Sequence, residues 1–125
     1  MKVDLTPLDN ALKSLGLVIK EKKTDIVRDA TIQRFEYCFE LSWKSLKRYF
    51  EWNQKLSESN VKNIIREAGK QGLIDSVERW FLFLDARNKT SHTYDLKTAE
   101  AVFDQALGFY PEAKKLFERL QVLQK

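Results

Sequence analysis

One stretch of the sequence, residues 32–50, restricts the possible folds more than any other. Large apolar side chains recur there every three or four residues: Ile32, Phe35, Phe39, Trp43, Leu46 and Phe50. This spacing places them on one face of an α-helix. Cys38, Leu41 and Tyr49 widen that face into a broad stripe, which is typical of the central helix of a helical bundle.

Two more helices are predicted from the flanking segments. Residues 5–22 form an amphipathic helix that ends in a lysine-rich turn and tolerates Pro7 because it lies in the first turn. Its apolar positions are Leu5, Leu8, Leu12, Leu15 and Ile19. A shorter helix begins after Ser59 or Asn60 as N-cap and reaches the region of Gly69.

The second half of the chain predicts two further helices. Asp75 or Ser76 caps a helix that turns four apolar side chains inward: Val77, Trp80, Phe81 and Leu84. Asp95 caps a long last helix, which Pro111 is expected to kink or split because proline lacks a backbone N–H. The inward side chains of that helix are Ala99, Val102, Phe103, Ala106, Leu107, Tyr110, Phe117, Leu120 and Leu123. We therefore expect an all-α antiparallel four-helix bundle with one additional short helix, forming a single domain over residues 1–125.

Composition limits the class of protein further. A chain of 125 residues can bury one core, and the lone cysteine, Cys38, lies within an apolar pattern, where it is expected to be a core residue in a reducing compartment. No signal peptide or membrane span is apparent, so we expect a cytoplasmic protein. The net charge of +4 permits an anionic partner, but the basic residues are scattered, as on solvated helix faces.

The inward stripe of the fourth predicted helix turns polar beyond Leu84. Helical spacing next reaches Arg87, Asn88 and Ser91, where another apolar turn would be expected. A buried charge is costly unless it is paired, so this change indicates a working site. On an ideal helix, Arg87 and His92 point about 140° apart. They converge on one ligand only if the helix distorts near Thr90, or if a second subunit completes the site.

His92 is the only histidine in the chain. Metal-independent cleavage of RNA needs a base for the 2′-hydroxyl proton and an acid for the leaving oxygen. It also needs a cation to stabilise the charge on phosphorus, for which the arginine fork is suited. Because one histidine cannot readily fill both proton-transfer roles, this chemistry predicts a homodimer with two copies of His92 and Arg87 in one cleft.

Structural interpretations of the same residues remain open. His92 could satisfy carbonyls at a helix end, and Tyr94 could be a core or cap residue. Arg87 could pair with Glu36 or Glu40, which form a line of charges with Lys44 spaced by four residues. That line is either an ion-paired face or the border of a cleft. We expect no metal site and no cofactor, since one histidine and one cysteine provide no usual ligand set.

Two segments resemble a known family. The run from Arg87 to Tyr94, Arg-Asn-Lys-Thr-Ser-His-Thr-Tyr, resembles the Arg-x4-His signature of the HEPN superfamily. Residues 32–44 are similar to the second helix of its nucleotidyltransferase substrate-binding branch, which includes HepT-type toxins. The resemblance covers residues 5–120. It implies a dimeric four-helix bundle paired with a minimal nucleotidyltransferase that is encoded nearby and acts as the antitoxin.

The resemblance also implies roles for individual residues. Arg87 and His92 would be catalytic in a metal-independent ribonuclease, with Asn88 positioning; the polar stripe adds Ser91 as a binding residue. The partner nucleotidyltransferase would attach AMP to Tyr94 and so silence the toxin. The alternative is a non-catalytic subunit that presents a nucleotide or other substrate to a separate nucleotidyltransferase.

Overall fold

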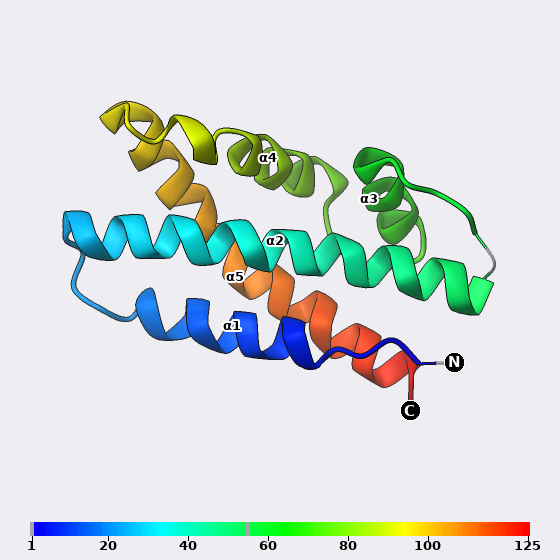
Figure 1. Cartoon of the computed structure of the whole chain (residues 1–125). Helices are drawn as coiled ribbons and strands as arrows, with labels where there is room; N and C mark the ends of the chain where they lie inside the picture. Colours follow the sequence, from blue (N-terminus) through cyan, green and yellow to red (C-terminus); the bar gives the residue numbers. More distant parts are fainter. Residues whose placement is uncertain (1, 55) are drawn as a thin grey trace.

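The computed structural model describes residues 2–54 and 56–125, and within them the chain is entirely helical, without a strand (Figure 1). The all-α prediction is confirmed. None of the helices in this described part is long and apolar enough to cross a bilayer. The elements in chain order are α1 (Thr6–Val18), α2 (Asp25–Gln54), α3 (Val61–Lys70), α4 (Val77–Asn88), the short 3₁₀ helix η1 (Thr90–His92) and α5 (Leu96–Leu123).

The central helix of the bundle is α2, as the broad stripe predicts. It packs against α1, α3, α4 and α5, and in Figure 1 the consecutive long helices run in alternating directions. The short α3 lies over the C-terminal half of α2, whereas α4 ends over its N-terminal half. The junction between α4 and α5 therefore lies at the end of the molecule away from α3.

The capping residues account for three of the helix starts. The side chain of Asn60 accepts a hydrogen bond from the backbone N–H of Asn63, and Ser76 accepts one from Arg79. Asp95 does the same for Thr98 at the start of α5. Each cap supplies a partner for a backbone donor that the helix itself leaves unpaired. The three predicted starts are thus confirmed.

The core is built around five aromatic rings from three helices. Phe35 and Phe39 of α2 meet Trp80 and Phe83 of α4 on the ring of Phe109 from α5, with centroid separations of 5.1–6.0 Å to that ring. Such pairs each contribute about 0.5–1.5 kcal/mol beyond their area burial. Cys38 is fully buried beside them, as expected, and its burial raises the pKa of the thiol to about 12.

The boundaries of the first two helices differ from the prediction. α1 ends at Val18 rather than residue 22. The residues that follow form a polar connection to α2, at whose start the Thr24 hydroxyl accepts the N–H of Val27. α2 extends past the apolar stripe at both ends. A solvated helix face needs no apolar residues, so the stripe marks only the packed part of the helix.

The last helix also departs from the prediction. Pro111 does not split α5; it lies on the exposed face, where water can bond the carbonyl that loses its helical donor. Leu107 and Leu123, predicted to point inward, are 39% and 54% exposed. Leu107 sits beside the buried Ala106 but on the uncovered side of the helix. Leu123 occupies the final turn, beyond the last buried residue, Leu120.

Candidate functional site

The polar run from Arg87 to Tyr94 forms the junction between α4 and α5, and we call these residues the junction site. α4 ends at Asn88, and the chain continues through one turn of 3₁₀ helix before Asp95 caps α5. The expectation that the helical stripe continues to Ser91 is therefore wrong. The helix ends because the Thr90 hydroxyl bonds the carbonyl of Arg87 at 2.8 Å and the Thr93 hydroxyl bonds that of Thr90 at 3.2 Å.

Arg87 connects α4 to α2. Its Nη2 lies 2.5 Å from Oε1 of Glu40, and its Nη1 donates to Oδ1 of Asn88 at 3.1 Å. The guanidinium stands over the Phe39 ring, 5.7 Å from its centroid. Of the two partners predicted for Arg87, Glu36 and Glu40, the structure shows the pair with Glu40. One carboxylate oxygen and one amide oxygen do not use all five N–H groups of a guanidinium, and the buried Nε has no partner among the described atoms.

The predicted line of charges on α2 borders the junction site. Glu40 also accepts a hydrogen bond from Nε1 of Trp43 at 3.3 Å and lies 3.7 Å from Nζ of Lys44. Glu36 shares the single proton of the Thr90 hydroxyl with the carbonyl of Arg87. The line is therefore both ion-paired and placed at the edge of the candidate site, so the two interpretations are compatible.

The side chains of His92 and Tyr94 point away from the bundle. Tyr94 is 87% exposed, which excludes a core role, and its ring lies 6.1 Å from the imidazole, tilted by 74°. The backbone of His92 is fixed at both ends, since its N–H bonds Lys89 and its carbonyl accepts from Asp95. Ser91 and Asn88 are exposed as well. The junction therefore holds an imidazole in solvent on a short, hydrogen-bonded turn.

The break after Asn88 means that the ideal-helix angle between Arg87 and His92 does not apply. The angle of about 140° between them applies to a continuous helix. In the structure, a 3₁₀ turn replaces the α-helix between Arg87 and His92. This is the distortion near Thr90 that is required if one chain is to form the site alone. Chemically, the junction offers an imidazole, which can act as a proton acceptor or donor, and a guanidinium, which can bind phosphate.

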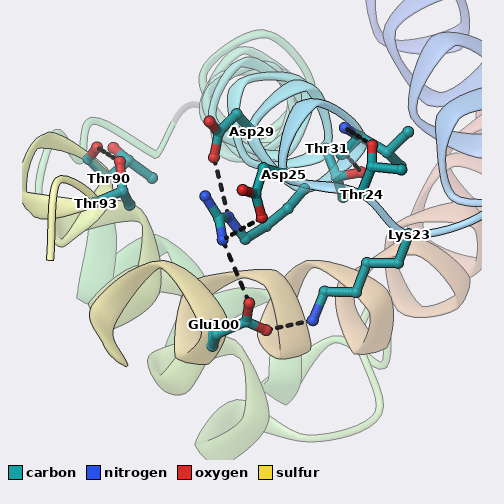
Figure 2. A network of polar contacts seen from close by, with 10 residues as sticks. Lys23, Thr24, Asp25, Asp29, Thr31, Thr90, Thr93 and Glu100 are labelled. Atoms are coloured by element: carbon teal, nitrogen blue, oxygen red, sulfur yellow. Dashed lines mark hydrogen bonds and ion pairs between the residues drawn. The ribbon is translucent and has the colours of Figure 1, made fainter. Parts of the chain in front are cut away.

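A second polar network lies beside the junction site (Figure 2). Arg28 at the start of α2 contacts Asp25 at 3.4 Å, Asp29 at 3.1 Å and Glu100 of α5 at 3.4 Å. Lys23 also pairs with Glu100, and these cations lower the pKa of the Glu100 carboxyl. This Arg28 network ties α2 to the first turns of α5, the helix that follows the junction.

Sequence reasoning named Thr90 only as the place where the helix would distort, and it missed Thr93. Both hydroxyls hold the turn, and Thr90 links it to Glu36. The available signal was the pair of threonines three residues apart in a polar run, a spacing that suits side-chain bonds to the backbone. No group of three or more histidine, cysteine or acidic side chains within residues 2–54 and 56–125 is placed to hold a metal ion.

Comparisons with known proteins agree on one family. The family model described as "Nucleotidyltransferase substrate binding protein like" matches residues 3–122. A Haemophilus influenzae protein named "Probable ribonuclease HepT" is 35% identical over 136 aligned positions, which cover 96% of this chain and 93% of that protein.

Two solved structures are similar to the whole fold. A Thermus thermophilus protein is 33% identical with a TM-score of 0.83, over 90% of this chain and 98% of its own. A protein from Haemophilus influenzae is 33% identical with a TM-score of 0.84, over 94% and 99% of the two chains. Its structure is described as revealing "the fold of a substrate binding domain of a nucleotidyltransferase".

Proposed function

The chain belongs to the nucleotidyltransferase substrate binding protein-like family, and on that basis we propose that it is a metal-independent ribonuclease of the HepT type. In this proposal it acts as a homodimer and as the toxin of a pair whose antitoxin is a minimal nucleotidyltransferase. The observation that carries the proposal is the junction site itself. It combines an exposed imidazole with a guanidinium whose Nη1 and Nη2 have N–H groups beyond those directed at Asn88 and Glu40.

The chemistry assigns a step to each side chain. The imidazole of His92 takes the proton of the ribose 2′-hydroxyl, whose oxygen attacks phosphorus while the bond to the 5′-oxygen breaks. Arg87 binds the phosphate oxygens, where negative charge builds up. Asn88 holds one guanidinium nitrogen in place through its Oδ1, and Ser91 is a candidate hydrogen-bonding group for the substrate. The second copy of His92 protonates the leaving oxygen.

Exposed apolar side chains around the junction support a two-fold interface there. Leu82 on the outer side of α4 is 53% exposed, and Leu96 in the first turn of α5 is 62% exposed. A hollow of about 160 Å³ between the two helices has Leu82 and Lys89 on its rim. Exposed apolar surface that is rimmed by polar residues marks interaction sites when it is contiguous, so the proposed interface joins Leu82 and Leu96 across the α4–α5 junction.

The catalytic proposal is tested with the purified full chain and RNA in the presence of EDTA. We expect cleavage, and we expect His92→Ala to slow it by at least about 100-fold, the usual contribution of a proton-transferring group. Lys114→Gln, a charge removed from the outside of α5, serves as the control and should cleave normally. Cleavage that persists in His92→Ala, or that requires a divalent metal ion, contradicts the proposal.

Control by AMP rests on the exposure of Tyr94. Its hydroxyl is free to attack the α-phosphate of ATP bound to a nucleotidyltransferase, with pyrophosphate leaving and the tyrosine losing its proton. Intact-mass spectrometry after incubation with the partner enzyme, Mg²⁺ and ATP should show added adenylyl groups and loss of cleavage. Tyr94→Phe should prevent the addition, whereas Tyr37→Phe, at the other exposed tyrosine described, should not.

A second candidate function is a non-catalytic subunit that presents a nucleotide to the nucleotidyltransferase. It is favoured by the description of the similar Haemophilus influenzae structure as a substrate binding domain. This function predicts no cleavage by the free dimer and binding of AMP or ATP that weakens in Arg87→Ala. A flat calorimetric titration with both nucleotides, with and without the partner enzyme, would count against it.

A further inference from the structure

The exposed face of α2 carries a hollow that the proposed mechanism does not use. Its volume is about 450 Å³, within the range of small-ligand sites. We call it the basic hollow, and its lining residues all come from α2: Trp43, Lys44, Lys47, Arg48, Glu51 and Trp52. The lining thus consists of two indoles, three cations and one carboxylate.

The charges of the basic hollow favour an anionic ligand. Glu51 pairs with Lys47 at 2.9 Å, and Lys44 is shared with Glu40 at 3.7 Å. Arg48 is exposed on the same face. Ion pairs on exposed helix faces contribute less than about 1 kcal/mol, so a phosphate can compete for these cations at little cost.

The two tryptophans provide flat surfaces at either end of the hollow. Trp52 is 44% exposed, although an indole is more stable when covered. Trp43 is half-buried and is fixed by its Nε1 bond to Glu40. Aromatic side chains interleaved with basic ones are the arrangement that proteins use to bind single strands, since bases stack on the rings while cations follow the phosphates.

The basic hollow begins where the junction site ends. Glu40 contacts Arg87 on one side and both Trp43 and Lys44 on the other. From Glu40 to Trp52 the helix rises about 18 Å at its usual 1.5 Å per residue. A strand whose reacting phosphate lies on Arg87 can therefore continue along α2 for a few nucleotides without leaving this face.

We propose that the basic hollow binds single-stranded RNA next to the cleavage point, with a base on Trp52 and phosphates on Lys47 and Arg48. This inference rests on the proposed ribonuclease function, because it names the substrate that the junction site receives. RNA is favoured over a second protein surface because lysine and glutamate are depleted from protein interfaces, whereas this hollow has two lysines and a glutamate. A hollow between α1 and α5 provides a contrast: its two lysines, Lys13 and Lys114, face two carboxylates.

The experiment measures binding of a fluorescently labelled single-stranded oligoribonucleotide to the full chain carrying His92→Ala, so that cleavage does not interfere. We expect Trp52→Ala to weaken binding by at least about fivefold, the lower end for one base–aromatic stack, and Trp52→Phe to restore most of it. Lys47→Gln and Arg48→Gln should each reduce the slope of log affinity against log salt by about 0.7. Lys114→Gln removes a charge from the other hollow and should change the affinity least.

The outcomes separate this inference from the proposed function. Binding that depends on Trp52, Lys47 and Arg48 supports the hollow even if the wild-type chain cuts no RNA. If the wild type cleaves RNA and these variants bind RNA with unchanged affinity, RNA binding at the basic hollow is wrong and the proposed ribonuclease function still holds. If these variants change the oligomeric state measured by light scattering and leave the RNA affinity unchanged, the face is a protein interface. That result would also overturn the inference.

Discussion

Arg28 and Arg87 each connect α2 to another helix through carboxylates, and the difference between them separates a structural cation from an available one. The side chain of Arg28 is 12% exposed and contacts three carboxylates, from Asp25, Asp29 and Glu100. The side chain of Arg87 is 25% exposed and contacts one carboxylate, so its Nη1 and Nη2 have N–H groups beyond those directed at Asn88 and Glu40. Arg28 is surrounded by acids, whereas Arg87 has donors left for a ligand.

The largest expected difference is in RNA cleavage. Arg87→Ala should lower kcat by about 100- to 1000-fold, as the loss of a donor to a developing oxyanion does elsewhere. Arg28→Ala should leave cleavage nearly unchanged but lower the melting temperature, because three acids lose their shared cation. Single-turnover cleavage and thermal unfolding of both variants provide the measurements. Equal losses of activity would remove the distinction between the two arginines.

A smaller difference is expected between two threonine hydroxyls. Thr90→Val keeps the shape of the side chain but removes the bonds to Glu36 and the Arg87 carbonyl, so the turn that holds His92 shifts. We expect kcat to fall about tenfold with little change in KM, since small misplacements of a catalytic group are costly. Thr90→Ser should restore most of the rate.

Thr24 gives the matched control for that experiment. Its hydroxyl caps α2 beside the Arg28 network, accepting the N–H of Val27. Thr24→Ala should lower the free energy of unfolding by about 1 kcal/mol and leave cleavage unchanged. If Thr90→Val behaves like Thr24→Ala, then Thr90 is a structural residue only.

A gain of function is expected at Glu40. Its carboxylate occupies the guanidinium that an RNA phosphate would need, so Glu40→Gln removes a competing anion. We expect RNA affinity at low salt to rise about two- to fivefold, in line with the strength of partly exposed ion pairs. Glu100→Gln, the equivalent change beside Arg28, should leave RNA affinity as it is. A lower affinity in Glu40→Gln would show that the carboxylate positions Arg87 more than it blocks it.

The smallest effect concerns acid stability. The hydrogen bond from Lys23, with Arg28 beside it, holds the pKa of Glu100 below its usual 4.5. The contribution of Glu100 to stability is therefore present above pH 4.5 and is lost as the pH falls through the lowered folded-state value. Urea midpoints measured from neutral to acidic pH should fall less steeply for Glu100→Gln. The fall of the urea midpoint with pH that remains in Glu100→Gln comes from other groups with lowered pKa values, among them Asp75 and Asp95.

The sequence predicts the bundle well because its evidence is local. Apolar spacing identifies every long helix, and the caps at Asn60, Ser76 and Asp95 come from side chains that bond their own helix starts. The end of α4 is harder to predict, because neither glycine nor proline marks it. It depends on Thr90, whose hydroxyl bonds one residue three positions away and another fifty-four positions away.

Contacts between distant segments account for the other features of the structure that the sequence does not predict. The sequence offers two partners for Arg87, and only the packing of α4 on α2 selects Glu40. The pairing of Lys23 with Glu100 spans 77 positions, and no spacing rule indicates it. The exposure of Leu107 likewise depends on which side of α5 the other helices leave uncovered.

The length of α2 sets a constraint on how this protein can vary. Arg28, the Glu40 partner of Arg87 and the basic hollow all lie on this one 30-residue helix. Inserting or deleting one residue between Glu40 and Lys47 would turn everything beyond it by about 100° and take the hollow out of line with the junction site. Insertions are tolerated most easily in surface connections. We therefore expect length changes between relatives to fall between the helices, and we expect the length of α2 to stay constant.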